Sequence, residues 1–294
     1  MEDFVHLHVH TKYSKYDGLS EVKDLVDHAI NDGMKGMAIT DHGTLLGIRE
    51  FSDYCNQVNK ERARNGIEPF KPIVGCEMWV AHHRMQDKKV SDGDRCGYHL
   101  TVLAKNQKGY RNLSKLVSDS WKEGFYYRPR TDRQELERYH EGLIVCSGCI
   151  AGEIPYKILH SSIDDAREAV EWYHHVFGDD YYLEIQRYST NNQDTHTDSE
   201  IYELQQRVNP VLIKLGKEYG IKVIATNNCH FVDEDSIDDQ LSTIDIRGTY
   251  GLPFDRQQRF KTRKEMYDVF ADIPEVLRNT MEILNKVEIY KCDS

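Results

Sequence analysis

Short apolar runs alternate with longer amphipathic stretches along this chain. Seven of the short runs predict strands, and most are rich in Val, Ile and Leu, as parallel strands buried on both faces are. The runs are FVHLHV (4–9), GMAIT (36–40), PIVGCEM (72–78), HLTVLA (99–104), GLIVCS (142–147), YYLEIQ (181–186) and KVIAT (222–226).

Helical periodicity fills the intervals between these runs. Clear examples are residues 20–33, 164–177 and 199–220, and each is followed by Gly or polar residues that mark the end of a helix. Strand and helix alternating over this length predict an α/β protein with a parallel sheet, either open or closed into a barrel. Seven units favour the barrel.

The pattern changes after the last predicted strand. From Asp233 onward, residues 233–246 and 262–289 carry helical signals and no further strand is predicted. We therefore expect a barrel domain over residues 1–255 and a helical extension over residues 256–294 that leads toward a further region.

Charge and cysteine content narrow the class of protein. The chain has 38 Lys and Arg against 49 Asp and Glu, a net charge of -11, which argues against a chain that holds nucleic acid by itself. Its carboxylates and imidazoles suit several divalent cations. Seven scattered cysteines, an acidic start and no apolar run of about 20 residues predict a reduced, cytoplasmic protein without a membrane segment.

The ends of the predicted strands carry side chains that bind metals. In a parallel α/β barrel the chemistry lies at the C-terminal ends of the strands. The period of two residues places the three histidines of the first run on one face. In chain order the candidates are His6, His8, His10, Asp17, Asp41, His42, Glu77, His99, Cys146, Cys149, Asn228, Cys229 and His230.

This set of side chains predicts a cluster of metal ions. Imidazole and carboxylate suit zinc, manganese or iron, and a thiolate shifts the preference toward zinc. About eight or nine ligands exceed one four-coordinate site and fit two or three metals that share bridging groups. Such clusters hydrolyse phosphate esters.

Each candidate also has a purely structural interpretation. A single strand histidine is more often a satisfied core residue, TDHG (40–43) can be a turn, and one CxxC pair (146–149) is a weak signal. The occurrence of such residues at six strand ends together favours one shared site. We assign no ligand role to His28, His82, His83, His140, His160, His174, His175 and His196, which lie on predicted helices or loops.

The motifs HLHVH, ITDHG, GCE, HLTVLAKN, the SGC turn and ATNNCHF, in this order, resemble the PHP (polymerase and histidinol phosphatase) superfamily. Two longer segments, 99–136 and 260–283, are similar to the PHP domains at the N-terminus of bacterial DNA polymerase III alpha subunits. The resemblance covers nearly the whole chain. It implies a distorted (βα)7 barrel with up to three metals at the C-terminal ends of the strands.

The resemblance also implies a ligand set. One metal would take His6, His8, Glu77 and residue 228, a second would share Glu77 and add His99 and Cys149, and a third would take Asp17, His42 and His230. Glu77 would act in catalysis as the bridge between two metals, and Asp17 or Asp41 would relay a proton. His10 is expected to support a ligand or to face the substrate.

One position departs from the family pattern. The family has Asp at position 228, in a pattern like NDxHY, whereas this chain has Asn228 in NNCHF. An Asn side chain offers a carbonyl oxygen, but it carries no charge and cannot act as a base. The departure weakens the first metal site or leaves that position to a water.

By resemblance, the expected activity is metal-dependent phosphodiester hydrolysis, in the form of a 3′→5′ exonuclease that removes mispaired primer ends. Zinc or manganese are the preferred metals, with iron or magnesium as alternatives. The implied partners are primer-template DNA held by the full-length polymerase, the remaining polymerase domains and a proofreading subunit. A PDxDxD-type motif is absent from the sequence, so polymerisation is not expected of this chain.

Two alternative functions stay open. The domain can be a metal-binding scaffold with little activity, which stabilises the polymerase or docks a proofreading subunit. It can also be a stand-alone phosphatase for small phosphate esters. The stretch FYYRPRTDR (125–133) has aromatic and basic residues that can contact DNA, but a folded loop with a turn pinned by proline is the preferred interpretation.

Overall fold

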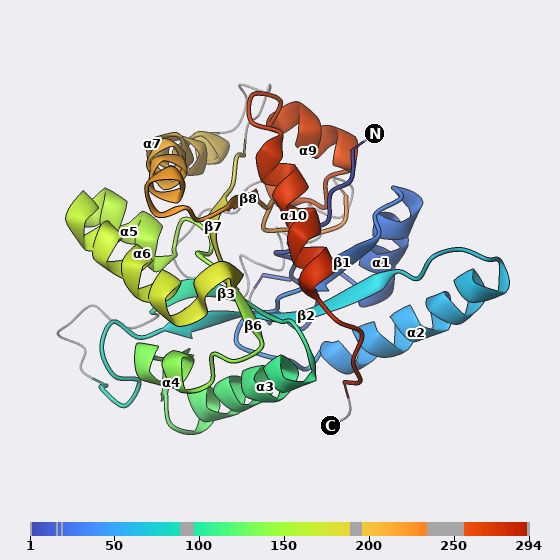
Figure 1. Cartoon of the computed structure of the whole chain (residues 1–294), viewed down its shortest axis with the longest axis horizontal. Helices are drawn as coiled ribbons and strands as arrows, with labels where there is room; N and C mark the ends of the chain where they lie inside the picture. Colours follow the sequence, from blue (N-terminus) through green and yellow to red (C-terminus); the bar gives the residue numbers. More distant parts are fainter. Residues whose placement is uncertain are drawn as a thin grey trace.

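A curled sheet with helices around it forms the centre of the molecule (Figure 1). The computed structural model describes residues 2–15, 17–18, 20–88, 97–188, 196–233 and 256–292. The strands are β1 (Gly36–Ile39), β2 (Lys71–Val80), β3 (Tyr98–Ala104), β4 (Phe125–Tyr126), β5 (Arg128–Thr131), β6 (Leu143–Cys146), β7 (Tyr181–Ile185) and β8 (Val223–Ala225). Their order is β4-β5-β2-β3-β6-β7-β8, and β1 pairs with β2.

The N-terminal segment, residues 4–10, links the two edges of this sheet. On one side Ala38 N donates to His6 O and Thr40 N donates to Val9 O, and on the other Cys229 N donates to His8 O. Six of the predicted strands are β1, β2, β3, β6, β7 and β8, and this segment takes the place of the seventh. The predicted α/β barrel is thereby confirmed.

Strand β3 corrects the prediction that the sheet is all parallel. It runs antiparallel to both of its neighbours, β2 and β6. A parallel pair needs a crossover of a dozen or more residues, usually with a helix, and the described part of the β2–β3 connection has none. As a result β3 begins at the end of the barrel where its neighbours finish.

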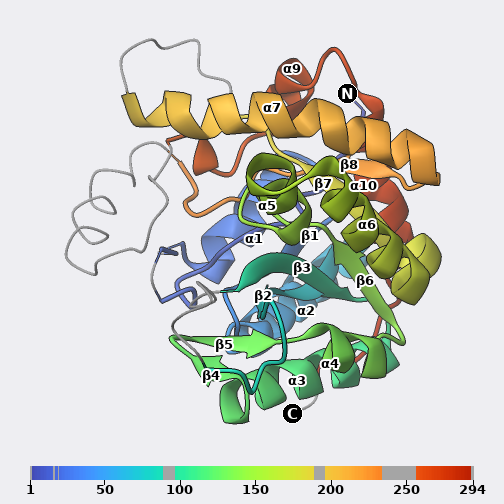
Figure 2. The same ribbon diagram turned by 90° about the vertical axis from the view of Figure 1, so that its left-hand side faces the viewer.

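The helices surround the sheet in the views of Figures 1 and 2. They are α1 (Val22–Asn31), α2 (Ile48–Arg64), α3 (Gln107–Lys122), α4 (Arg133–Arg138), α5 (Glu153–His160), α6 (Ile163–Phe177), α7 (His196–Tyr219), α9 (Arg263–Val269) and α10 (Glu275–Lys286). Side chains of Asn106, Asp132, Ser162 and Thr262 accept a hydrogen bond from the first turn of α3, α4, α6 and α9. These caps satisfy backbone donors that a helix start leaves unpaired.

Helix α10 closes the end of the barrel at which most strands begin. Its Asn279 donates to Val223 O at the start of β8, and its Thr280 accepts from Val5 N. Lys71, the first residue of β2, donates to Leu284 O. Figure 2 shows α10 at one end of the barrel, opposite the loops that follow β1. The described part of the predicted helical extension thus packs directly on the barrel, while residues 234–246 lie outside the described residues.

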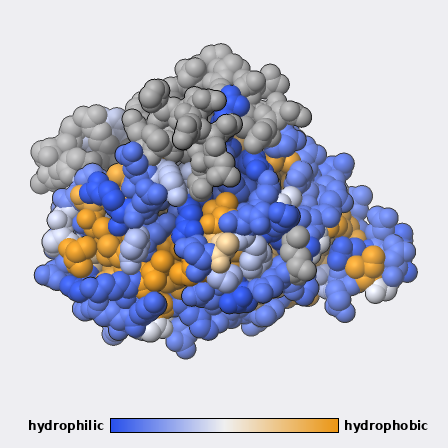
Figure 3. Space-filling view, turned by 90° about the horizontal axis from the view of Figure 1, so that it is seen from above, coloured by the Kyte–Doolittle hydropathy of each residue, from blue (hydrophilic) through white to orange (hydrophobic). Residues whose placement is uncertain are grey.

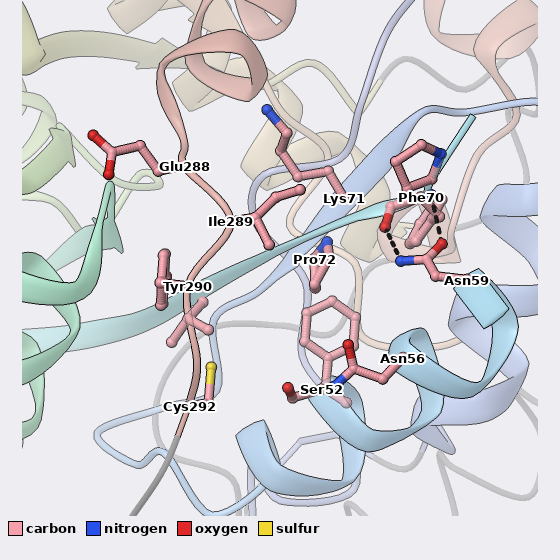
Figure 4. A pocket seen from close by; sticks show the side chains of 13 residues that line it. Ser52, Asn56, Asn59, Phe70, Lys71, Pro72, Glu288, Ile289, Tyr290 and Cys292 are labelled. Carbon is pink, nitrogen blue, oxygen red and sulfur yellow. Dashed lines mark hydrogen bonds between the residues drawn. The ribbon is translucent and has the colours of Figure 1, made fainter. Parts of the chain in front are cut away.

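The chain that follows α10 lies against α2 and the start of β2. Together they enclose a cavity of about 80 Å³ whose lining includes Phe51, Phe70 and Tyr290 (Figure 4). Asn59 is held beside this cavity by hydrogen bonds with the backbone of Phe70. Burial of this kind fixes the C-terminal segment on the barrel.

The outer surface is mainly hydrophilic. The face seen from above in Figure 3 is largely blue, with several separate orange groups between the polar side chains. This agrees with the 30% charged residues of the sequence. Among the described residues, none of the helices combines the length and the hydrophobicity that a bilayer span requires.

Candidate metal centre

Glu77 stands at the centre of a group of four imidazoles. Its Oε1 lies 3.2 Å from His8 Nε2 and 2.9 Å from His99 Nδ1. Its Oε2 lies 3.2 Å from His10 Nε2 and 2.9 Å from His42 Nδ1. Because β3 runs antiparallel, His99 at its start reaches the same end of the barrel as residues at the ends of the other strands. A single carboxylate is thus shared by four side chains from three segments of the chain.

Asp17 extends the cluster on one side. Its Oδ2 lies 3.0 Å from His42 Nε2, and its Oδ1 lies 3.7 Å from His230 Nδ1. The His10 ring lies between two others, with its centroid 4.2 Å from that of His42 and 4.3 Å from that of His230. These contacts join residues 17, 42 and 230 in the grouping that the sequence predicts.

Cys149 completes the other side. Its Sγ lies 3.6 Å from Glu77 Oε1 and 3.5 Å from His99 Nδ1. Burial raises the pKa of this thiol, so a thiolate at this position needs a cation beside it. Cys146, the other cysteine of the CxxC pair, lies in strand β6 within the hydrophobic core.

Three overlapping sets of ligand atoms lie close enough to hold metal ions. The sets are His8, His10 and Glu77; His42, Glu77 and His99; and His10, His42 and His230, with the atoms of each set within 4.8 Å of one another. Glu77 and two histidines belong to more than one set. The arrangement is therefore suited to ions that share ligands.

Several buried atoms here make no hydrogen bond, although all but the last lie within ion-pair distance of a neighbouring imidazole or carboxylate. They are His8 Nε2, His10 Nε2, Asp17 Oδ1, His42 Nδ1, Glu77 Oε2 and Asn228 Oδ1. A buried polar atom without a partner costs on the order of 1–3 kcal/mol, and native proteins contain few of them. Their concentration around one carboxylate fits divalent cations, which would satisfy all of these atoms.

The charges of the cluster are strongly coupled. Burial disfavours a charged His8, but the carboxylates of Glu77 and Glu184 outweigh burial and raise its pKa to about 10. Against the same effect of burial, Asp17 and Glu77 raise the pKa of His42 to about 10, and Glu77 raises that of His99 to about 10. Without a metal, protonated imidazoles balance these carboxylates.

The remaining two histidines of the cluster are neutral in the metal-free protein. Burial and the nearby His42 and His230 lower the pKa of His10 well below its usual value. Burial likewise lowers the pKa of His230 to about 4, although Asp17 opposes the shift. A neutral imidazole is the form that binds a metal.

Glu184, in strand β7, holds His8 from behind and was missed by the sequence prediction. Its Oε1 lies 2.7 Å from His8 Nδ1, and Thr101 and Gln186 also donate to this carboxylate. A carboxylate that accepts from one ring nitrogen leaves the lone pair of the other free for a metal. The signal in the sequence is a single acidic residue inside the apolar run YYLEIQ, comparable to the histidines in the first run.

Asp41 lies next to the cluster but does not enter it. Its carboxylate accepts from Thr11 N at 2.7 Å, Thr11 Oγ1 at 2.8 Å and Ser14 Oγ at 2.8 Å. Ser14 Oγ in turn lies 2.9 Å from His10 Nδ1. Since the serine proton goes to Asp41, Ser14 accepts from His10 Nδ1, which leaves Nε2 of His10 directed at Glu77. Through Ser14, Asp41 thus orients His10, and the proton relay expected of Asp41 stays a prediction.

His6 does not join the cluster, and His10 does. The His6 ring lies 4.2 Å from the ring of Phe260, and its Nε2 donates to Lys261 O at 2.7 Å. The chain bends at His8, so the alternation of a regular strand does not carry through this residue. The pair of histidines at the mouth of the barrel is therefore His8 and His10.

Asn228 adopts a left-handed backbone conformation, with φ of 47°. Asn tolerates this conformation better than most residues. The neighbouring Cys229 exchanges backbone hydrogen bonds with His8 and His10, which places residue 228 beside these two histidines. Its buried Oδ1 is available as a neutral oxygen ligand.

For the other histidines, the structural interpretation stays a prediction. His28, His82, His83, His140, His160, His174 and His175 are absent from the three described ligand sets. His82, for example, stacks on Tyr98 with ring centroids 4.1 Å apart. The side chain of His196 lies outside the described part of the structure.

Comparison with known proteins gives both family and relatives. Residues 6–188 match the model of the PHP domain. DNA polymerase III subunit alpha of Borreliella burgdorferi is 39% identical over 98% of this chain and 24% of that protein. The same subunit of Treponema pallidum is 35% identical over 97% of this chain and 23% of that protein. The chain thus spans about a quarter of the length of these curated relatives.

A solved structure is also similar. Histidinol phosphate phosphatase of Lactococcus lactis, crystallised with zinc, L-histidinol and phosphate, has a TM-score of 0.41 and 14% sequence identity. The match covers 88% of this chain and 99% of that one.

Proposed function

Because this chain belongs to the PHP domain family, we propose that its metal centre hydrolyses phosphodiester bonds in DNA, as the N-terminal domain of a DNA polymerase III alpha subunit. The proposed activity is 3′→5′ exonuclease proofreading in the cytoplasm. Its partners would be primer-template DNA, the remaining polymerase domains and a proofreading subunit. The names of the relatives support DNA as the substrate.

The observation that carries this proposal is the group of buried imidazole and carboxylate atoms around Glu77 that make no hydrogen bond. A core that only had to be stable would fill this space with apolar side chains or complete hydrogen bonds. Two or three divalent ions, zinc or manganese in the first place, would satisfy these atoms. When bound, such ions polarise phosphoryl oxygens and generate a nucleophile from water near neutral pH.

The chain's own residues would divide this work. His8, His10, Glu77 and Asn228 would hold one ion, and Glu77, His99 and Cys149 a second. Glu77 would be shared by the two ions, since histidines of both sets lie within 3.2 Å of its carboxylate oxygens. A third ion would lie among His42, Asp17 and His230.

Asp17 is the proposed proton carrier. It is one-fifth exposed at the mouth of the barrel, so it can exchange a proton with bulk water. The neighbouring imidazoles lower its pKa in spite of burial, so the carboxylate is ionised in the metal-free chain.

A matched pair of variants tests the proposal. The purified chain is loaded with zinc or manganese and given a primer with a mispaired 3′ end, and His10→Gln is compared with His6→Gln. Both residues are fully buried, but only His10 faces Glu77. We expect His10→Gln to lose hydrolysis by at least about a hundredfold, because a ligand is removed, and His6→Gln to keep it.

Three results would contradict the proposal. They are no metal-dependent cleavage by the wild-type chain, equal loss of activity in both variants, and hydrolysis of a chromogenic phosphate monoester without any cleavage of DNA. The last result would indicate a phosphatase for small esters.

A scaffold function is the second candidate, and Asn228 is the observation that favours it. An uncharged oxygen at this position weakens one metal site. If metal only stabilises the fold, His10→Gln would lower the melting temperature of the full-length polymerase while its nuclease activity stayed as in the wild type.

A further inference from the structure

Three aromatic side chains stand exposed beside the metal centre. Trp121 is 51% exposed, Phe125 45% and Tyr127 52%. Trp121 lies near the C-terminus of α3, and the other two residues belong to the β4–β5 hairpin that follows. The rings of Trp121 and Phe125 stack with centroids 5.5 Å apart and planes 21° apart. We refer to these three residues as the aromatic platform.

One residue of the platform, Trp121, is attached to the chain directly after the proposed ligand His42. Trp121 Nε1 donates to Gly43 O at 2.7 Å, and Gly43 follows His42 in the chain. The ring of Trp79 stacks on that of His42, with centroids 5.3 Å apart. The guanidinium of Arg128 lies over the ring of Trp79, 5.6 Å from its centroid. A series of flat groups therefore leads from the ligands toward the surface.

The hairpin that carries the platform is firmly anchored. Arg130 is fully buried and donates to Met85 O and Asp87 O. A side chain at Gly124 would approach Arg130 O to 1.8 Å, so the two segments are in close backbone contact. At the tip of the hairpin Tyr127 has φ of 60°, a conformation that costs roughly 1–2 kcal/mol for a residue other than glycine. A strained, exposed tyrosine on a rigid support is typical of a binding surface.

We propose that the aromatic platform binds the unpaired bases of single-stranded DNA whose 3′-terminal phosphodiester lies at the metal centre. This inference rests on the proposed function for the position of the scissile bond. Nucleic-acid bases stack on aromatic faces whatever their sequence, which a proofreading site requires. The positive Arg128 between platform and ligands complements the DNA backbone.

The net charge of the chain also favours stacking over phosphate neutralisation. At -11 the chain cannot rely on many phosphate contacts, so planar rings would supply most of the affinity. A protein partner on the same surface is the competing occupant. The contact of Trp121 with Gly43 places the platform beside the proposed ligand His42, and this position favours the nucleic acid as the occupant.

The test measures binding of fluorescein-labelled oligo(dT) by fluorescence anisotropy, with Ca²⁺ in place of Zn²⁺ or Mn²⁺. We expect Trp121→Ala and Tyr127→Ala each to weaken binding by roughly 5- to 150-fold, the range for loss of one stacked base. Trp121→Phe keeps a ring but loses the bond to Gly43, and it should restore most of the affinity. Ile289→Ala is the control, because Ile289 is 81% exposed on the chain after α10, at the opposite end of the barrel.

Hydrolysis assays separate this inference from the proposed function. With Mn²⁺ bound, the alanine variants should lower kcat/KM for the oligonucleotide much more than for bis(p-nitrophenyl) phosphate, and mainly through KM. Wild-type affinity in both alanine variants, with both diesters still cleaved, would overturn the platform and leave the proposed function standing. Oligonucleotide binding that depends on Trp121, without cleavage of either diester, would support the platform and reject the hydrolytic function. A double variant that binds DNA normally but no longer associates with the remaining polymerase domains would assign the surface to a protein partner and overturn the inference.

Discussion

The His8 ring lies between two buried carboxylates, one on each nitrogen. Glu77 faces Nε2 at 3.2 Å and Glu184 faces Nδ1 at 2.7 Å. The two carboxylates have different roles, because only Glu77 also contacts three other imidazoles. Glu184 sets the tautomer of His8, and through it the direction in which the ring can bind a metal.

We predict that Glu184→Gln lowers metal affinity by about 10- to 100-fold, the usual effect of losing a carboxylate behind a histidine ligand. The amide keeps the size of the side chain, so the fold should persist. Isothermal titration with Zn²⁺ measures the change. Glu282→Gln is the matched control, since Glu282 lies on α10 and accepts from Tyr182. Equal affinities for wild type and Glu184→Gln would show that Glu184 does not orient His8.

The neutral side chain at position 228 gives a second prediction. Asn228→Asp restores a negative charge beside His8 and His10, and we expect it to raise affinity for Zn²⁺ by at least about tenfold. Its effect on nuclease activity then separates catalysis from scaffolding, because a scaffold would gain stability alone. The change is measured by competition with a zinc chelator, and unchanged affinity would exclude residue 228 from the ligand set.

At the residue scale, the sequence predicts most of the cluster but errs on orientation. Glu77, His99, Cys149 and the Asp17 group were expected and are brought together. The resemblance assigns His6 and His8 to the first metal, whereas the structure brings His8 and His10 to Glu77, and the bend at His8 has no signature in the residue types. The role of Glu184 could not be predicted, because a single acidic residue within a strand belongs to no recognisable motif.

At the scale of elements, β3 and α10 decide how the site is built. His99 lies at the start of β3, and the antiparallel direction of this strand brings it to the end of the barrel that carries the proposed metal centre. Helix α10 closes the opposite end and packs Ile283 and Leu277, both fully buried, into the common core. The strand segments could be predicted from hydrophobicity, but strand direction depends on the connection, where local sequence gives little information.

We predict that Ile283→Ala destabilises the fold by about 2–5 kcal/mol, the usual cost of such a cavity. Metal affinity should change little under conditions where the variant is folded, because the substitution lies at the far end of the barrel. Urea denaturation with a chelator present measures the free energy of unfolding. Arg278→Ala, on the half-exposed face of the same helix, should stay within about 0.5 kcal/mol of wild type. A loss below about 1 kcal/mol for Ile283→Ala would mean that α10 is not part of the cooperative unit.

At the scale of the whole molecule, metal and protons compete for the same buried nitrogens. His8, His42 and His99 have pKa values of about 10 in the metal-free chain, above the ordinary value of 6.5. Raised pKa values mean that protonation stabilises the fold. This contribution is complete below pH 6.5 and is lost as the pH rises toward 10. A bound metal requires the neutral rings, so metal stabilisation has the opposite pH dependence.

We therefore predict that the difference in melting temperature between the zinc-loaded and the chelator-treated chain widens as the pH rises from 6 to 9. At pH 6 the protonated imidazoles replace much of the metal's charge, and the metal-free chain stays folded. As the pH rises above 6.5, the imidazoles of the unfolded chain lose their protons while those of the folded chain keep them, so the protonated cluster stabilises the metal-free fold less and less. Free zinc at about 100 times its dissociation constant contributes about 2.7 kcal/mol. A constant difference over this range would contradict the proposed exchange of protons for metal.

The N-terminal segment between the two sheet edges also has a consequence for the order of folding during synthesis. The segment that carries His8 and His10 leaves the ribosome before its partners, which lie around Cys229 and Thr280, the latter 275 positions after Val5. At roughly 5–20 residues per second the segment waits about 14–55 seconds for these partners. During translation its apolar side chains are an exposed target for chaperones, and the metal site forms among the last parts of the domain.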